Sequence, residues 1–311
     1  MAKKIPKQVK SIQEFKAPTI DYSFQRSISY SQTLSYNTCP HQWALSYGKK
    51  LLEYRPSIHT VFGTALHEVI QEWLNVMYNR TIKQANEMNL ESLFETKLFK
   101  VYKEEKEKYQ KHFSTAEELQ SFWMDGVEIL RYLQKKRAMY FSTQKVHLVG
   151  VEILLLYPLS DKLFFKGFVD VLFYDEAAER YLVIDIKTST SGWNELAKKD
   201  EKKTAQLLLY KEFIAKQFNI DVNKIDVQYF IVKRKVPTNP DFASMARRVQ
   251  EFTPPSGKIK RGQVLSLLNK FISDCFDQDG KFIDKEYEKK SSTTNCRFCE
   301  YKDTALCTEG I

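Results

Sequence analysis

The sequence lacks a long apolar run. No stretch approaches the ~20 consecutive apolar residues that a membrane helix needs, and the opening MAKKIPKQVK has no apolar segment of a secretory signal. We therefore expect a cytoplasmic protein without a membrane partner. The chain also has no Gly-x-x-x-x-Gly-Lys-Ser/Thr motif, so it contains no P-loop motor of its own.

Cysteine is scarce, and its spacing is uneven. Five cysteines in a chain expected to be cytoplasmic argue against a disulfide framework. Three of them form the pattern Cys296-x2-Cys299-x7-Cys307 in a polar tail. Cys39 is the natural fourth ligand, because an iron-sulfur cluster or a tetrahedral zinc ion takes four thiolates. Cys275 is left over and is expected in the core.

The charge is unbalanced toward the positive. Lys and Arg number 48 against 39 Asp and Glu, a net charge of +9 that would attract a polyanion. Many basic proteins bind no nucleic acid, so this excess alone does not identify a DNA- or RNA-binding protein.

The chain divides into an arm and one large domain. Residues 1–27 are basic without clear periodicity and predict a mobile arm or an edge segment, and residues 28–311 predict a single domain. We expect a helical part over about 28–140, a core over about 145–280 and a cysteine tail over 291–311.

The helical part follows from periodicity. Pro40 separates two expected short helices, and residues 61–78 place a stripe of apolar side chains on one helix face with His67 at its border. Residues 90–137 contain few Gly or Pro and predict two or three inserted helices.

From residue 145 the composition changes to β-branched and aromatic runs. Three strands of a meander are expected at 145–159, 162–174 and 180–187. A helix at about 202–218, a strand at 227–233 and a helix at about 264–276 follow.

Asp185 and Lys187 are the most informative pair in these strands. Period two puts both on one face of IDIK, so an acid and an amine leave an apolar strand side by side. If the turn DEAAER closes symmetrically between Ala177 and Ala178, Asp170 lies opposite Asp185. Their Cβ atoms would then be ~4.5–5.5 Å apart, close enough to share a cation.

This combination suits phosphodiester hydrolysis. Asp170 and Asp185 supply oxygen ligands for Mg²⁺ or Mn²⁺, and Lys187 supplies a positive group near the attacking water or the developing charge. Glu152 could orient a water or a second metal, and His67 could add a nitrogen ligand. The competing interpretations are a structural Asp185–Lys187 ion pair and a core histidine.

Gln206 and Tyr210 lie four residues apart, hence on one helix face. An amide and a phenol there could hydrogen-bond phosphate oxygens or the Lys187 region, or could simply cap the core.

The order of these motifs resembles the RecB-type branch of the PD-(D/E)XK nucleases. That family shows a Ser/Tyr-rich helix with Cys-Pro, then Gly-x-x-x-His, Glu, Gly-x-x-Asp, Asp/Glu-x-Lys and Gln-x-x-x-Tyr. The corresponding residues are, in order, Cys39-Pro40, Gly63 with His67, Glu152, Gly167 with Asp170, Asp185 with Lys187, and Gln206 with Tyr210.

The resemblance implies an α/β fold with a restriction-endonuclease-like core: a mixed sheet flanked by helices, an inserted helical region and a C-terminus stapled by a metal cluster. It also implies that His67, Asp170, Asp185 and the Ile186 carbonyl hold the metal while Lys187 assists catalysis. Glu152, Gln206 and Tyr210 complete the expected catalytic set. A bacterial or phage origin fits this branch.

The cysteine arrangement is similar to the iron-sulfur staple of the AddB nuclease domain and of CRISPR-associated adaptation nucleases. Their last gap is usually shorter than the seven residues found here. A [4Fe-4S] cluster on Cys39, Cys296, Cys299 and Cys307 is therefore expected, with zinc as the alternative and free thiols as a third.

The expected function is a Mg²⁺- or Mn²⁺-dependent exonuclease on single-stranded or end-processed DNA, in replication, recombination or repair, with a separate helicase or recombination partner. One alternative is a non-catalytic DNA-binding scaffold that kept the fold. Another is a zinc-stapled RNA-binding module.

Overall fold

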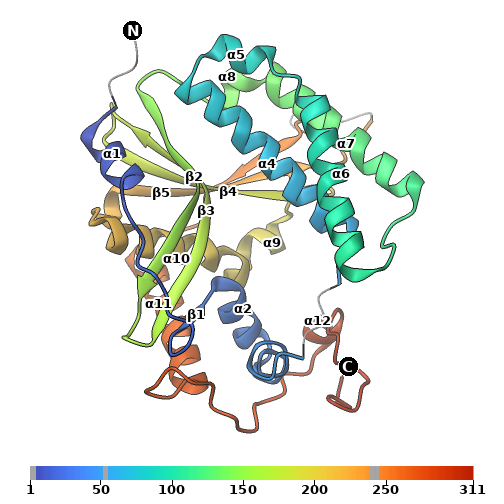
Figure 1. The fold of residues 1–311 in the computed structure, drawn as a ribbon, viewed down its shortest axis with the longest axis vertical. Coiled ribbons are helices and arrows are strands. Elements are labelled where there is room, and N and C mark those ends of the chain that lie inside the picture. Colours follow the sequence, from blue (N-terminus) through green and yellow to red (C-terminus); the bar gives the residue numbers. More distant parts are fainter. Residues whose placement is uncertain (1–4, 52–54, 239–241, 243–244, 311) are drawn as a thin grey trace.

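The computed structural model describes residues 5–51, 55–238, 242 and 245–310 of the chain. At its centre is a six-stranded mixed sheet, flanked by helices on both faces (Figure 1). Its strands are β1 (Arg26–Ile28), β2 (Val146–Pro158), β3 (Leu163–Asp175), β4 (Arg180–Ser189), β5 (Ile225–Lys233) and β6 (Val249–Phe252). The expected α/β fold with a mixed sheet is confirmed.

The meander β2–β3–β4 lies where the sequence predicts it. The β3–β4 hairpin pairs Asp175 with Arg180 and continues in that register to Val171 and Ile184. It is therefore centred between Ala177 and Ala178, as the symmetric turn predicts. Strand β5 then pairs in parallel with β4 after a helical crossover.

β3 is shared between two partners along one edge. Residues 163–165 pair with β1, and residues 171–175 pair with β4, while β2 follows the opposite edge. Residues 166–170 of β3 therefore face an opening between β1 and β4. Both Gly167 and Asp170 lie in this interval.

The helices form two layers. One face of the sheet carries α2 (Tyr30–Thr38), α10 (Glu201–Phe218) and α11 (Lys258–Cys275). The other carries α4 (Ile58–Asn79), α5 (Ile82–Glu87), α6 (Leu90–Tyr109), α7 (Ala116–Lys135) and α8 (Arg137–Tyr140), which contain the inserted region (Figure 1). Each layer has its own apolar core.

The stripe predicted on α4 is buried in the second core. The side chains that form it are Phe62, Leu66, Val69, Ile70, Trp73 and Met77. On α2 and α3 (Pro40–Trp43), the two short helices meet at Cys39, and Pro40 occupies the first turn of α3. A single π-helical turn, Ala44–Gly48, follows α3. Helix α11 begins at Lys258, earlier than the predicted Val264.

The N-terminal segment is more ordered than predicted. Helix α1 (Lys7–Gln13) buries Val9 and Ile12 against the sheet, and β1 forms an edge strand on β3. Of the two expectations for residues 1–27, the edge segment therefore fits residues 26–28, and the mobile arm does not fit α1.

Several short elements after residue 190 were not predicted. They are β6 and the helices α9 (Glu195–Lys199) and α12 (Thr293–Cys296). Among the described helices, none combines the length and the apolar character needed to cross a bilayer.

Candidate active site

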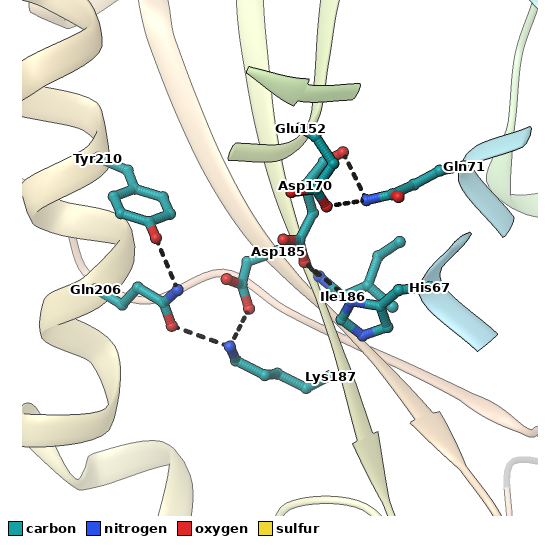
Figure 2. Close-up of polar contacts among 9 residues, drawn as sticks. All are labelled: His67, Gln71, Glu152, Asp170, Asp185, Ile186, Lys187, Gln206 and Tyr210. Atoms are coloured by element: carbon teal, nitrogen blue, oxygen red, sulfur yellow. Dashed lines mark hydrogen bonds and ion pairs between the residues drawn. The ribbon is translucent and has the colours of Figure 1, made fainter. Parts of the chain in front are cut away.

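A cavity of about 320 Å³ opens where β3 and β4 separate, between α2, α4 and α10. Asp170, Asp185 and Lys187 line it, together with His67, Gln206 and Tyr210. These side chains converge in Figure 2. These six predicted site residues thus lie around one space, although they come from four elements, whereas Glu152 and Ile186 do not line it.

At this cavity the side chains of β2 and β3 switch from one face of the sheet to the other. Glu152 has φ 49°, a left-handed value that is rare for a residue other than glycine. On β2, Ile153 packs in the α10 layer and Val151 packs in the α4 layer, although residues two apart normally share a face. On β3, Val169 and Val171 differ in the same way.

Glu152 and Asp170 lie at the point of this change. The β2–β3 register pairs Val151 with Val171 and Ile153 with Val169, so Glu152 is directly opposite Asp170. Sparsely populated backbone conformations persist only where the surroundings determine them, and they cluster at functional sites. Asp170 thus lies where the side chains of β3 change face, next to the end of the β3–β4 pairing.

Asp170 is tied to the neighbouring strand. Its Oδ2 accepts a hydrogen bond of 2.7 Å from the backbone amide of Ile186, and His67 Nδ1 lies 3.7 Å from the same oxygen. The hairpin register predicts Asp170 opposite Asp185, and the observed pairing ends one step before that position, at Val171 and Ile184. The Asp170 carboxylate therefore accepts the Ile186 amide at the position where the backbone pairing of β3 with β4 ends.

Asp185 begins a polar chain that leads to α10. Lys187 Nζ lies 2.9 Å from Asp185 Oδ2 and donates a 3.0 Å hydrogen bond to Gln206 Oε1. Gln206 Nε2 in turn donates to the Tyr210 hydroxyl at 3.2 Å. Gln206 thus contacts both Lys187 and the Tyr210 hydroxyl (Figure 2).

Gly167 allows α10 to approach β3. A Cβ atom at this position would lie 2.9 Å from the Tyr210 ring, closer than real contacts permit. The Tyr210 hydroxyl also receives a hydrogen bond from the Phe168 backbone, and burial raises the Tyr210 pKa to about 12, so the phenol stays neutral. A glycine in the Gly-x-x-Asp motif is thus required by packing.

Burial dominates the electrostatics of the two carboxylates. The side chain of Asp185 is only 1% exposed. Desolvation raises the pKa of Asp185 to about 6 against the opposing attraction of Lys187, and the nearby Asp170 raises it further. Desolvation likewise raises the pKa of Asp170 to about 6. Two carboxyl groups whose pKa values are raised by burial therefore line one cavity.

His67 is neutral at physiological pH. Its burial lowers the imidazole pKa to about 4, although the negative charge of Asp185 acts in the opposite direction. A neutral imidazole keeps a lone pair free for a metal ion.

The donor set fits a hard divalent cation. Neither carboxylate oxygen of Asp185 has a hydrogen-bond partner of good geometry, although both are buried. Buried polar atoms are normally satisfied, and a cation would satisfy these while relieving the repulsion from Asp170. Among the described residues, no three His, Cys, Asp or Glu side chains already surround one point as a preformed metal site. The Lys187 ammonium contacts Asp185 instead.

Gln71 is a site residue that sequence analysis missed. Its amide donates to Glu152 Oε1 at 2.6 Å and to the Asp170 carbonyl at 3.2 Å. One side chain therefore binds both strands at the point where their side chains change face. Gly63, His67 and Gln71 are spaced by four residues and share one face of α4. Its spacing of four residues from His67 was the sequence signal that could have identified Gln71.

The cysteine tail lies against the α2–α3 junction. Asn295 Nδ2 donates to the Thr38 carbonyl at 3.2 Å, and the His41 amide donates to the Glu288 carbonyl at 3.1 Å. Cys39 sits between these two contacts in sequence.

Three of the four expected thiols lie near one another at this junction, but the described cysteines do not form a group that could hold a metal ion. Burial raises the pKa of Cys299, and Cys39 and Cys307 lie near enough to raise it further. Cys296 is buried at the end of α12, and none of the described cysteines is in a disulfide. Cys275 lies in the apolar core, as predicted.

Two comparisons with known proteins bear on this site. The model of the PD-(D/E)XK nuclease superfamily matches residues 27–307, a span that contains every residue of the cavity described above. A search of curated protein sequences finds no match.

The raised carboxyl pKa values predict an unusual stability change with pH. Above pH 6 the folded protein holds an ionised, buried Asp185 that the unfolded chain hydrates better, and below pH 4 both states are protonated and this cost disappears. Without metal, Asp185→Asn should therefore be more stable than wild type by about 1–3 kcal/mol at pH 7. This advantage should shrink as the pH falls from 6 to 4.

Urea unfolding in EDTA measures this change. The lowered pKa of His67 gives a contribution of opposite sign, rising through pH 4 to 6.5, but it is common to both proteins. Asp226→Asn is the matched control: Arg180 lowers the pKa of Asp226, so its loss should destabilise the protein at pH 7. If Asp185→Asn is destabilised equally at pH 4 and pH 7, the proposed burial cost is wrong.

Proposed function

This chain belongs to the PD-(D/E)XK nuclease superfamily, and we propose that it is a Mg²⁺- or Mn²⁺-dependent exonuclease that hydrolyses single-stranded or end-processed DNA. The family implies a nuclease that uses divalent metal ions. The observation that carries the proposal is the convergence of Asp170, Asp185 and Lys187 in one cavity, where Asp185 Oδ1 is buried without a hydrogen-bond partner and Oδ2 contacts only the Lys187 ammonium.

The metal-holding residues in this proposal are Asp170, Asp185, His67 and the Ile186 carbonyl. A bound divalent ion supplies Lewis acidity and lowers the pKa of a bound water. The Ile186 amide orients Asp170 by donating to Oδ2, and Asp170 lines the cavity. His67 contributes a neutral nitrogen beside the same carboxylate.

Lys187 has the role of the positive group at the reacting phosphate. Its ammonium contacts Asp185 and Gln206, and with a metal ion on Asp185 the amine would turn toward the substrate phosphate or the attacking water. Gln206 and Tyr210 are positioning residues for this amine. Glu152, held by Gln71, orients a water or a second metal in the proposal.

The substrate and its context follow from charge and family. A net charge of +9 favours a polyanion. The RecB-type branch implies DNA ends in replication, recombination or repair, and the chain carries no P-loop motif, so a separate helicase or recombination protein would supply the unwound strand. A non-catalytic scaffold would not need Asp170, Asp185 and Lys187 together, and an RNA-binding module would not depend on Mg²⁺ or Mn²⁺.

Cleavage of end-labelled single- and double-stranded DNA tests the catalytic proposal. Asp185→Ala and Lys187→Ala should each lower kcat by roughly 10²–10³-fold, because each removes a charge that acts on the transition state. EDTA should abolish cleavage, and Mg²⁺ or Mn²⁺ should restore it.

Asp226→Asn is the control for this assay, because it removes a carboxylate from the same sheet outside the cavity. Its rate should stay within about twofold of wild type. The catalytic proposal fails if wild type is inert on every substrate, or if both active-site variants keep full activity.

We propose further that Cys39, Cys296, Cys299 and Cys307 hold a [4Fe-4S] cluster, with zinc as the alternative. The proposal is supported by the Cys296-x2-Cys299-x7-Cys307 spacing and by the approach of Cys39 and Cys307 to Cys299 where the tail meets the α2–α3 junction. Such a cluster would join the two ends of the domain and so stabilise the fold.

Anaerobic purification separates the two metals. A cluster should give brown protein absorbing near about 400 nm, and Cys299→Ser should bleach it and lower the melting temperature. Cys275→Ser is the control for the absorbance, because this thiol lies in the apolar core. Colourless protein with bound zinc would contradict the cluster, and metal-free protein would contradict both.

A further inference from the structure

Three large aromatic side chains are exposed on β3 and on the segment that precedes β1. Tyr22, Phe24 and Phe168 are 56%, 48% and 44% exposed. We call these residues, with Lys162 and Lys166, the aromatic strip. Large aromatic side chains are usually buried in a soluble core, so a cluster of them outside it indicates a binding surface.

Lysines alternate with these rings. Lys162 Nζ lies 4.5 Å from the centre of the Phe24 ring, and Lys166 Nζ lies 5.9 Å from that of Phe168. Lys166 also lies 3.5 Å from the Tyr22 hydroxyl. In the described part of the chain, these two ammonium groups contact rings and a hydroxyl rather than carboxylates, so their positive charge is available to an anion.

The strip is held in place by backbone contacts. Arg26 donates to the carbonyls of Tyr22 and Gln25, and its own amide donates to the Lys162 carbonyl. The segment that carries Tyr22 and Phe24 is therefore fixed to the start of β3. Rings presented on a fixed backbone lose little entropy when they bind a partner.

The strip leads into the catalytic cavity. Lys166 and Phe168 line the cavity together with Asp170. These three residues alternate along β3 with Gly167 and Val169, which face α10. Along a strand, Phe168 precedes Asp170 by about 7 Å and Lys166 precedes it by about 13 Å. A ligand that follows the strip therefore reaches the carboxylates.

We propose that the aromatic strip binds single-stranded nucleic acid, with unpaired bases stacked on Phe168 and the rings of Tyr22 and Phe24, and with phosphates at Lys162 and Lys166. This inference rests on the proposed nuclease function, because it assigns the path of the substrate strand to the same cavity. An aromatic face stacks on an unpaired base and cannot reach the stacked bases of a duplex. The strip thus selects unpaired strands.

Binding in EDTA tests the strip without cleavage. Fluorescence anisotropy would measure the Kd of oligothymidylate, of an abasic strand of equal length, and of a duplex. Phe168→Ala should weaken oligothymidylate binding by roughly 5- to 150-fold, the loss of one stacked base, and leave the abasic strand unchanged. Phe168→Trp should retain the wild-type affinity, because it keeps an aromatic face.

Phe99→Ala is the matched control, since Phe99 is 47% exposed on α6 and does not line the cavity. It should change neither affinity. Lys166→Gln should weaken both single strands and reduce the salt dependence of log K by about 0.7, the loss of one phosphate contact. Lys100→Gln on α6 should leave the slope unchanged.

The possible outcomes separate this inference from the nuclease proposal. If wild type binds the oligothymidylate and abasic strands with equal affinity, the proposal for the aromatic strip is overturned even if wild type cleaves DNA. The same holds if Phe168→Ala weakens the binding of both strands equally. Duplex binding that is as tight and as sensitive to Phe168→Ala also overturns it. Stacking without cleavage under any metal supports the strip and contradicts the nuclease proposal instead.

Discussion

The structure depends on two acidic side chains that a folded protein would ordinarily keep apart. Asp170 and Asp185 face one cavity, both are largely withdrawn from water, and burial raises both pKa values to about 6. Holding them there costs folding free energy, which well-packed surroundings must offset. The Asp185–Lys187 contact and the hydrogen bond from the Ile186 amide to Asp170 offset part of this cost.

The surroundings that hold the pair come from both layers of the fold. From the α4 layer, Gln71 bridges the bend at Glu152 and Asp170, and His67 lies beside the Asp170 carboxylate. From the α10 layer, Gln206 contacts Lys187, and Gly167 lets Tyr210 approach β3. The first turn of α10 is itself anchored by hydroxyl groups of Tyr30 and Tyr229, which donate to the Lys202 and Lys203 carbonyls.

Sequence predicted those parts of the fold whose signals are local. The apolar runs marked β2, β3 and β4, and the symmetric turn fixed the hairpin register that brings Asp170 toward Asp185. The α4 stripe and the Pro40 break were also visible, because helical periodicity and proline act on neighbouring residues.

Features that depend on distant partners were not visible in the same way. Strand β1 has only three residues and forms because it pairs with β3. Helix α1 has seven residues and is stabilised by the burial of Val9 and Ile12. The left-handed backbone of Glu152 carries no sequence signal, because glycine is the residue that usually marks such a conformation. Tyr22 and Phe24 meet Lys162 and Lys166 only because β1 docks beside β3.

The central claim is that the buried carboxylate pair is a divalent metal site, and calorimetric titration of Mn²⁺ into the protein at pH 5 and pH 7 tests it most directly. The raised pKa values predict tighter binding at pH 7 than at pH 5, with proton release on binding near pH 6, and loss of binding in Asp170→Asn. Binding that is independent of pH, or unchanged in Asp170→Asn, would contradict the claim.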